Sequence, residues 1–245
     1  MQFYKIAWWL VLIAVASYFY GNVNNAIFIS VLLGKDVRKE GSGNPGTLNM
    51  SRVFGIKIGA LTLVLDILKG VVPPLIARLC FSDSTFLGGE LSVGMFVSAL
   101  AGFFVVTGHI FPVLYGFKGG KGVASTIGVL FVFNWWLMLI VGALAIAFIF
   151  ITKLGSVGSF IAITPPAIYF VINNFVKYVV NSSLTKDALY AFIIMNVLAL
   201  LMIVEVYVAH RKNIARLLRG EEHPTDWAGM VKKLKEKKKK EEPET

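Results

Sequence analysis

Residues 91–122 have the sequence LSVGMFVSALAGFFVVTGHIFPVLYGFKGGKG. Their first part, Leu91 to Pro112, is almost entirely apolar and has the length that crosses a bilayer, for which about 20 residues suffice. The second part, Tyr115 to Gly122, holds four glycines and two lysines in eight residues. An apolar stretch that leads directly into a glycine-rich basic loop predicts a membrane helix with a polar site at its end.

The composition extends this prediction to the whole chain. Of the 245 residues, 56% are hydrophobic and 16% are charged, and the mean hydropathy is +0.72. Soluble domains carry about 25% charged residues. The net charge of +10 does not indicate nucleic-acid binding, because basic residues also gather on cytoplasmic loops and against anionic lipid. A single cysteine, Cys80, excludes a disulfide framework within the chain and a cysteine-based metal site.

Further stretches are apolar and long enough to span a membrane: Ile6 to Leu33 with an interruption at Gly21 to Asn25, Ile56 to Cys80, Val157 to Val176 and Leu189 to Ala209. The region from Val123 to Ile151 is too long for one ordinary span and is interrupted at Asn134. Two helices packed as a hairpin, the first short and starting inside a re-entrant loop, fit it best; one long tilted span is the alternative. We therefore expect an all-α, polytopic transmembrane bundle of about seven spans, or six with the tilted helix.

The charged residues orient this bundle. The loop from Gly34 to Lys57 contains five lysines and arginines against Asp36 and Glu40, and the C-terminal tail is also basic. The loops on the opposite side carry fewer basic residues. By the positive-inside rule the N-terminus lies outside and the C-terminus lies in the cytoplasm, which an odd number of spans allows.

The first of three unusual cytoplasmic segments is GSGNPGTLNMSR, residues 41–52. Three glycines in six residues allow backbone N–H groups to turn inward around an anion. Neutral hydrogen-bonding side chains and one cation suited to oxyanions follow in the same segment: Ser42, Asn44, Asn49 and Arg52. A flexible turn rich in small residues explains the same composition equally well.

The second segment, GHIFPVLYGFKGGKGVAS, covers residues 108–125. Glycines and a lysine precede a predicted helix N-terminus, which itself favours anions. The spacing differs from that of a nucleotide-hydrolysing phosphate loop. Lys118 and Lys121 have an alternative role in contacts with lipid headgroups, and a histidine at a helix end, such as His109, is more often structural than catalytic.

The third segment begins at His210, after the last predicted span. If that helix continues, His210, Asn213 and Arg216 share one face; a basic helix beside a membrane otherwise binds lipid. Two charged residues inside a predicted span, Asp66 and Lys69, are three residues apart and are costly in hydrocarbon unless they have partners. A structural ion pair and a functional role remain equally open for them.

Together, in this order, the three segments resemble the motifs of the bacterial acyl-phosphate:glycerol-3-phosphate acyltransferase family, PlsY. That family's blocks have the approximate form GSGN-x-GATN with a following Arg, GH-x-x-P with FKGGKGVAT, and H-R-x-N-x-x-R-L-x-x-G. The matching stretches here are GSGNPGTLNMSR, GHIFPVLYGFKGGKGVAS and HRKNIARLLRGEEH. Thr47-Leu48 replaces Ala-Thr and Ser125 replaces Thr, so a hydroxyl contact expected of the family at position 48 is in doubt.

The resemblance covers about residues 10–223. It implies that residues 1–223 form an integral-membrane acyltransferase domain and that residues 224–245 form a charged, disordered cytoplasmic tail that faces lipid. It also implies location in the bacterial inner membrane, with the active site facing the cytoplasm.

The activity implied by the resemblance is transfer of a fatty acyl group from acyl phosphate to the 1-hydroxyl of glycerol 3-phosphate. The products are lysophosphatidate and inorganic phosphate, in the first step of phospholipid synthesis, and the reaction uses no metal or cofactor. The partners are therefore acyl phosphate, glycerol 3-phosphate and the lipid bilayer, with no nucleic acid. The alternative is a membrane transporter for an organic phosphate, which also needs anion sites at helix ends.

The residues expected to carry the chemistry are Ser42, Arg52, Lys121, His210 and Asn213. The residues expected to bind the substrates are Gly41, Gly43, Asn44, Asn49, His109, Lys118, Gly119, Gly120, Gly122 and Ser156. In this hypothesis the glycine segments and Lys121 hold the acyl phosphate. Arg52, His210 and Asn213 hold glycerol 3-phosphate and position its hydroxyl for attack on the acyl carbon.

Overall fold

The computed structural model describes residues 2–86, 90–180, 184–222, 224, 225 and 229. Over these residues the chain is helical, apart from one isolated bridge between Thr85 and Ser92. The α-helices are α1 (Phe3–Asn22), α2 (Asn25–Leu32), α3 (Thr47–Phe54), α4 (Ile56–Cys80), α5 (Val93–Ile110), α6 (Val123–Phe133), α7 (Trp135–Thr152), α8 (Gly155–Phe175), α9 (Lys186–Ala209) and α10 (Arg211–Leu218). Short 3-10 turns lie at Val37–Lys39 and Val113–Tyr115, and a π-helical turn at Val176–Val180 extends α8.

Six helical segments of the described chain are long and apolar enough to cross a membrane. They are Tyr4–Leu32, Ile56–Cys80, Val93–Tyr115, Trp135–Thr152, Gly155–Val180 and Lys186–Ala209. The prediction of an all-α transmembrane bundle is confirmed. The predicted domain boundary after residue 223 remains a prediction, and most of the predicted tail, residues 226–228 and 230–245, lies outside the described residues.

Helices α6 and α7 form the predicted hairpin in place of one long span. The chain breaks at Asn134, whose side-chain oxygen accepts a hydrogen bond from the backbone N–H of Leu137 at 3.2 Å. The 11 residues of α6 rise only about 16 Å, roughly half the hydrocarbon thickness of a bilayer. Val123 at the start of α6 and Ile149 near the end of α7 line the same cavity, so the hairpin enters and leaves at one end of the bundle.

Close helix packing depends on glycines that face neighbouring backbones. A Cβ atom at Gly21 of α1 would overlap the carbonyl oxygen of Val105 on α5, and one at Gly70 of α4 would overlap that of Ser125 on α6. Small residues at such contacts allow helices to approach closely in lipid, where burial of apolar side chains gives little driving force. The α1–α5 and α4–α6 pairs are among the most extensive contacts in the bundle, and they hold α5 and α6 in place beside α1 and α4.

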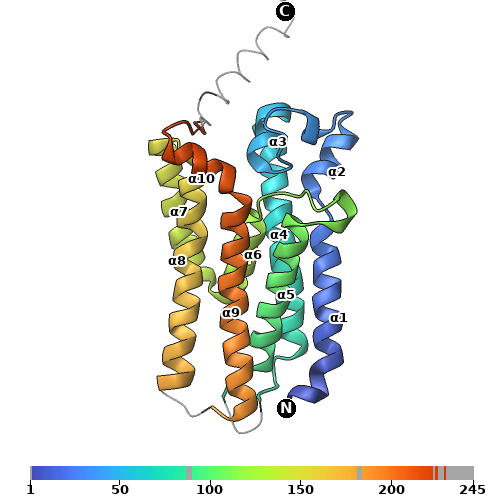
Figure 1. Cartoon of the computed structure of the whole chain (residues 1–245), viewed down its shortest axis with the longest axis vertical. Coiled ribbons are helices and arrows are strands. Elements are labelled where there is room, and N and C mark those ends of the chain that lie inside the picture. Colours follow the sequence, from blue (N-terminus) through green and yellow to red (C-terminus); the bar gives the residue numbers. More distant parts are fainter. Residues whose placement is uncertain (1, 87–89, 181–183, 223, 226–228, 230–245) are drawn as a thin grey trace, which may run out of the picture.

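The helices place three polar segments at one end of the bundle, away from the N-terminus (Figure 1). This end carries α3, the loop between α5 and α6, and α10, and is called the loop end below. α10 turns away from the axis of α9 (Figure 1). The three segments singled out in the sequence therefore lie together although they are far apart along the chain.

Candidate functional site

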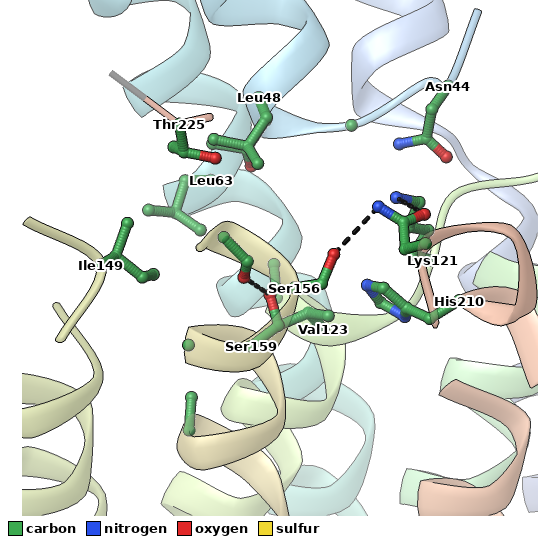
Figure 2. Close-up of a pocket in the computed structure, with 18 of the residues that line it drawn as sticks. Asn44, Leu48, Leu63, Lys121, Val123, Ile149, Ser156, Ser159, His210 and Thr225 are labelled. Atoms are coloured by element: carbon green, nitrogen blue, oxygen red, sulfur yellow. Dashed lines mark hydrogen bonds between the residues drawn. The ribbon is translucent and has the colours of Figure 1, made fainter. Parts of the chain in front are cut away.

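A cavity of about 350 Å³ opens at the loop end. Polar side chains such as Lys121 and His210 gather on one side of it, and Leu48, Leu63 and Ile149 lie on the other (Figure 2). The predicted site residues that line the cavity are Ser42, Asn44, Asn49, Arg52, His109, Lys121, Gly122, Ser156, His210 and Asn213. The predicted residues that do not line it are Gly41, Gly43, Lys118, Gly119 and Gly120. Lys118 is exposed, as expected of a lysine that contacts lipid headgroups.

The first glycine segment is a hydrogen-bonded turn held by Asn49. This buried side chain accepts a hydrogen bond from the backbone N–H of Ser42 at 2.9 Å. Its amide nitrogen donates to the carbonyl oxygens of Val37 and Glu40 at 3.1 and 2.9 Å. Gly41 has a φ of +57° and its missing side chain leaves room for the Asn49 amide. Asn49 thus uses both ends of its amide to fix the loop that presents Ser42.

In the second glycine segment, two glycines pack against the end of α5. The N–H of Gly119 donates to the carbonyl oxygen of Ile110, and the N–H of Gly120 donates to that of His109, each at 3.1 Å. These two N–H groups are therefore engaged with protein rather than directed into the cavity. Side chains at either position would overlap atoms of His109. The glycines consequently position the next residue, Lys121, by allowing the loop to approach the helix closely.

Three helices begin at the cavity without a side-chain N-cap of their own. They are α3, which follows Gly46, α6, which follows Gly122, and α8, which starts at Gly155. All three starting points line the cavity. The first N–H groups of a helix have no partner within it and carry a partial positive charge, so they bind anions readily. At α8 a carboxylate oxygen of Glu222 accepts from the N–H of Ser156 at 3.2 Å.

A chain of side-chain hydrogen bonds connects the second and third segments with α8. The ammonium of Lys121 donates to the side-chain oxygen of Asn213 at 2.7 Å, and the Asn213 amide donates to the hydroxyl of Ser156 at 2.9 Å (Figure 2). Asn213 therefore fixes the amine and the hydroxyl on the same wall of the cavity. Because the amide group bridges them, neither Lys121 nor Ser156 is free to turn toward solvent.

The cavity wall is electropositive. Burial lowers the pKa of Lys121, the nearby guanidinium groups of Arg216 and Arg52 add to this effect, and the carboxylate of Glu222 opposes it, so that the pKa is about 8. Like charges held close together are destabilising unless an anion neutralises them. The arrangement of Lys121, Arg52 and Arg216 therefore favours an anionic ligand at this wall.

His210 is fixed as a neutral hydrogen-bond acceptor. Its Nδ1 lies 2.8 Å from the carbonyl oxygen of Val206, and since a carbonyl only accepts, Nδ1 carries the hydrogen and Nε2 keeps its lone pair. Burial and, after it, the Lys121 cation lower the pKa of His210 to about 4, against the opposing effect of the hydrogen bond with Val206. The ring also packs edge-on against Phe160. The last span ends at Ala209, as predicted, and the helix does not continue unbroken, because His210 lies at the junction between α9 and α10.

The cavity continues from the polar wall into an apolar arm between α4, α6, α7 and α8. The arm is lined by Leu63, Ile67, Ile127, Ala145, Ile146 and Ala162. Leu48 belongs to the same apolar side (Figure 2), so the position where a hydroxyl was in doubt extends the arm instead. The lining residues outside the predicted site include three from the third segment and the chain that follows it: Arg216, Glu222 and Thr225. The three-residue spacing from Asn213 indicated Arg216, whereas no sequence signal indicated that the chain after α10 folds back to the cavity.

Comparison with known proteins supports an assignment for this arrangement. The family model for glycerol-3-phosphate acyltransferase matches residues 11–220. The chain belongs to the glycerol-3-phosphate acyltransferase family. It is 35% identical to the glycerol-3-phosphate acyltransferase of Francisella tularensis subsp. holarctica (strain OSU18) over 86% of this chain and 90% of that protein. It is 36% identical to that of Francisella philomiragia subsp. philomiragia over 85% and 89% of the two chains.

Two solved structures of this glycerol-3-phosphate acyltransferase family share the fold. The crystal structure of PlsY, an integral membrane glycerol 3-phosphate acyltransferase, in its glycerol 3-phosphate form has a TM-score of 0.69 and 29% identity. The match covers 91% of this chain and 98% of PlsY. The lysophosphatidic acid form gives a TM-score of 0.68 at 28% identity with the same coverage. The family prediction made from the three motifs is confirmed.

Proposed function

We propose that this chain transfers a fatty acyl group from acyl phosphate to the 1-hydroxyl of glycerol 3-phosphate, with release of lysophosphatidate and inorganic phosphate. The observation that carries this proposal is a single cavity with two unlike parts. One wall gathers uncapped helix N-termini with Lys121, Asn213 and Ser156. The rest is an apolar arm between membrane helices. A substrate with a phosphate joined directly to an acyl chain matches both parts.

The acyl phosphate group fits the wall beside α6. The first N–H groups of α6 and the ammonium of Lys121 face the same region. Donors fixed before the reaction stabilise charge that develops on the leaving phosphate and on the acyl oxygen without reorganisation. Gly122 lies at the helix start with a φ of +82°, a conformation that turns the loop directly into α6. The acyl chain then extends into the apolar arm, past Ile127 of α6.

Glycerol 3-phosphate, the second substrate, fits the opposite side of the polar wall. Arg52 and Arg216 supply fixed cations for its phosphate. The lone pair on His210 Nε2 accepts a hydrogen bond from a substrate hydroxyl and so orients it. With two phosphates bound, the repulsion among Lys121 and the two arginines is neutralised.

The proposed step needs no strong protein base. The oxygen of the 1-hydroxyl forms a bond to the acyl carbon, the bond from that carbon to the phosphate oxygen breaks, and the hydroxyl proton passes to the departing phosphate. His210, with a pKa of about 4, is a poor base at neutral pH, because efficient proton removal requires a pKa near the working pH. A phosphate monoester has a second pKa of about 6, and the departing phosphate is a stronger base than that, because it gains negative charge as its bond to the acyl carbon breaks. In this proposal His210 aligns the hydroxyl and the leaving group takes its proton.

We further propose that the protein lies in a bacterial inner membrane with the loop end in the cytoplasm. The loop before α3 carries Lys35, Arg38 and Lys39 on exposed positions at this end, and basic residues concentrate on cytoplasmic loops. The active site then faces the compartment that supplies glycerol 3-phosphate.

The test is an acyl-transfer assay on detergent-purified protein with palmitoyl phosphate and radiolabelled glycerol 3-phosphate. Labelled lysophosphatidate is the expected product, and a Lys121→Ala variant supplies the inactive control. Palmitoyl-CoA in a parallel reaction identifies a thioester donor, which would contradict the proposed donor. Absence of product with either donor, together with uptake of glycerol 3-phosphate into liposomes, would replace the enzyme with a transporter.

A further inference from the structure

A buried lysine lies directly beneath the second glycine segment. Lys69 of α4 is 3% exposed, and its ammonium donates to the carbonyl oxygens of Val23 and Gly21 at 2.8 and 3.3 Å. It lies 2.8 Å from Nδ1 of His109 and 3.6 Å from a carboxylate oxygen of Asp66. The ion pair, one of the two roles that the sequence left open for Asp66 and Lys69, is present, and the lysine also holds the end of α1 and a histidine.

The chemistry of this contact fixes the tautomer of His109. An ammonium has three donors and no acceptor, so the imidazole nitrogen that faces Lys69 must be the one with the lone pair. The hydrogen of the neutral ring is then on Nε2. Two backbone carbonyls and the Asp66 carboxylate surround Lys69, which favours its charged form. Asp66 is itself held by the amide of Asn25, which donates to its Oδ1 at 2.9 Å.

The hydrogen on Nε2 is directed at the junction of the two glycine segments. A Cβ atom at Gly120 would overlap His109 Nε2 and would lie 3.1 Å from the carbonyl oxygen of Pro45. Gly120 belongs to the second segment and Pro45 to the first. His109 lines the cavity although it is only 4% exposed. A side chain at position 120 would cover the Nε2–H group of His109, so only a glycine at this position leaves that donor open.

We propose that Lys69 is a positioning residue that locks His109 as an Nε2–H donor to a phosphate oxygen of the acyl donor. The inference rests on the proposed function for the identity of the ligand. Lys69 itself contacts backbone and His109 and is not among the residues that line the cavity. A neutral donor at this point adds a hydrogen bond to the phosphate without adding a fourth cation to Lys121, Arg52 and Arg216.

The tautomer is measured directly in the unmodified protein. The chain has three histidines, so ¹⁵N-histidine labelling gives few signals, and a His109→Gln variant assigns that of His109. We expect a protonated Nε2 and an unprotonated Nδ1, and a change in the Nε2 signal when inorganic phosphate or palmitoyl phosphate is added. A protonated Nδ1 would overturn the proposal. This measurement does not depend on turnover, so it separates failure of the inference from failure of the proposed function.

The functional test replaces Asp66 and Lys69 in the same variant, because Lys69→Met alone would leave the Asp66 carboxylate buried without its partner. In the Asp66→Asn/Lys69→Met variant we expect His109 to lose its single tautomer. The KM for palmitoyl phosphate should rise about ten- to a hundredfold, the range for a lost hydrogen bond to a charged group. kcat and the KM for glycerol 3-phosphate should change little. A higher KM for glycerol 3-phosphate alone would contradict the assignment to the acyl donor.

A double-mutant cycle distinguishes positioning from general support of the fold. If Lys69 acts through His109, adding the Asp66→Asn/Lys69→Met change to His109→Gln should raise the KM for palmitoyl phosphate no further. Independent, multiplicative effects would show that Lys69 only supports the bundle, and would overturn the proposal. Lys69→Gln in the Asp66→Asn background keeps an N–H donor for Nδ1, and we expect it to restore both the tautomer and much of the lost affinity.

Discussion

Replacing Gly119 with alanine tests whether the second glycine segment acts through close packing. An alanine Cβ at this position would lie 2.6 Å from the ring of Pro112 and 2.8 Å from the carbonyl oxygen of Ile110, and still closer to the carbonyl oxygen of His109. Two of these atoms are helix backbone and the third is a proline ring, so none moves easily. The loop must therefore move away from α5.

The size of the effect follows from what the loop holds. Moving it weakens two hydrogen bonds, from Gly119 to Ile110 and from Gly120 to His109, each with a net contribution of about 0.5–1.5 kcal/mol. The local loss is about 1–3 kcal/mol, too small to unfold the bundle. Lys121 follows directly, however, and a displacement of about 1 Å in an active site costs about a hundredfold in rate. We expect kcat/KM to fall about a hundredfold.

The control is Gly116→Asn in the same loop. Gly116 has a φ of +60° and open space around its missing side chain, and asparagine tolerates this left-handed conformation better than other residues. Lysophosphatidate formation from palmitoyl phosphate by the two purified variants is the assay. We expect Gly116→Asn to stay within about twofold of the parent, as an unconstrained surface substitution should. A Gly119→Ala protein with near-normal kcat/KM would refute the packing argument.

Further predictions concern the polar wall. Lys121→Ala should lower turnover about a hundredfold or more while the protein remains folded, as judged by circular dichroism. Because the Lys121 pKa is about 8 and only the ammonium attracts phosphate, loss of the ammonium should lower kcat/KM for palmitoyl phosphate little up to about one unit below this pKa, by about half at the pKa and by about tenfold per unit well above it. Lys121→Arg, which stays charged, should remove this fall; an unchanged profile would assign it to another group. Asn213→Asp should raise the KM of both substrates about tenfold or more in steady-state assays, because a carboxylate beside Lys121 neutralises it. Asn49→Ala removes three hydrogen bonds and should lower the free energy of unfolding by about 2–4 kcal/mol in denaturant titrations.

The membrane helices could be predicted from sequence because each is a long apolar run with a defined end. Ile56–Cys80 was predicted with the bounds that α4 has, and the break at Asn134 was visible as one polar residue in an apolar region. Its amide caps α7 by accepting a hydrogen bond from the N–H of Leu137. Element ends that depend on tertiary contacts were less accessible. The end of α5 at Ile110, two residues before the predicted Pro112, is one example, because the carbonyl oxygens of His109 and Ile110 accept hydrogen bonds from the glycine loop that folds back on them.

The candidate site was predictable at the level of segments but less so at the level of atoms. Glycines, a lysine and a histidine beside membrane spans indicated an anion site. The sequence gives no sign that the N–H groups of Gly119 and Gly120 bond to α5, since that depends on how the loop folds back. The sequence also does not show that Glu222 reaches α8, because no residue pattern in the turn after α10 indicates in which direction the chain continues.

The hydrogen bonds at the loop end explain why this end of the bundle favours phosphate. An antiparallel bundle brings helix C-termini and N-termini to the same end, and their dipoles would largely cancel. Here the C-terminal carbonyls are occupied: Lys69 holds those of α1, the glycine loop holds those of α5, and the His210 ring holds Val206 of α9. The N-termini of α3 and α6 have no side-chain cap. Since these carbonyl oxygens are satisfied by protein and the first N–H groups of α3 and α6 are not capped by a side chain, the remaining field attracts anions. The glycines, Lys69 and His210 are therefore needed for the polarity of the site as well as for its shape.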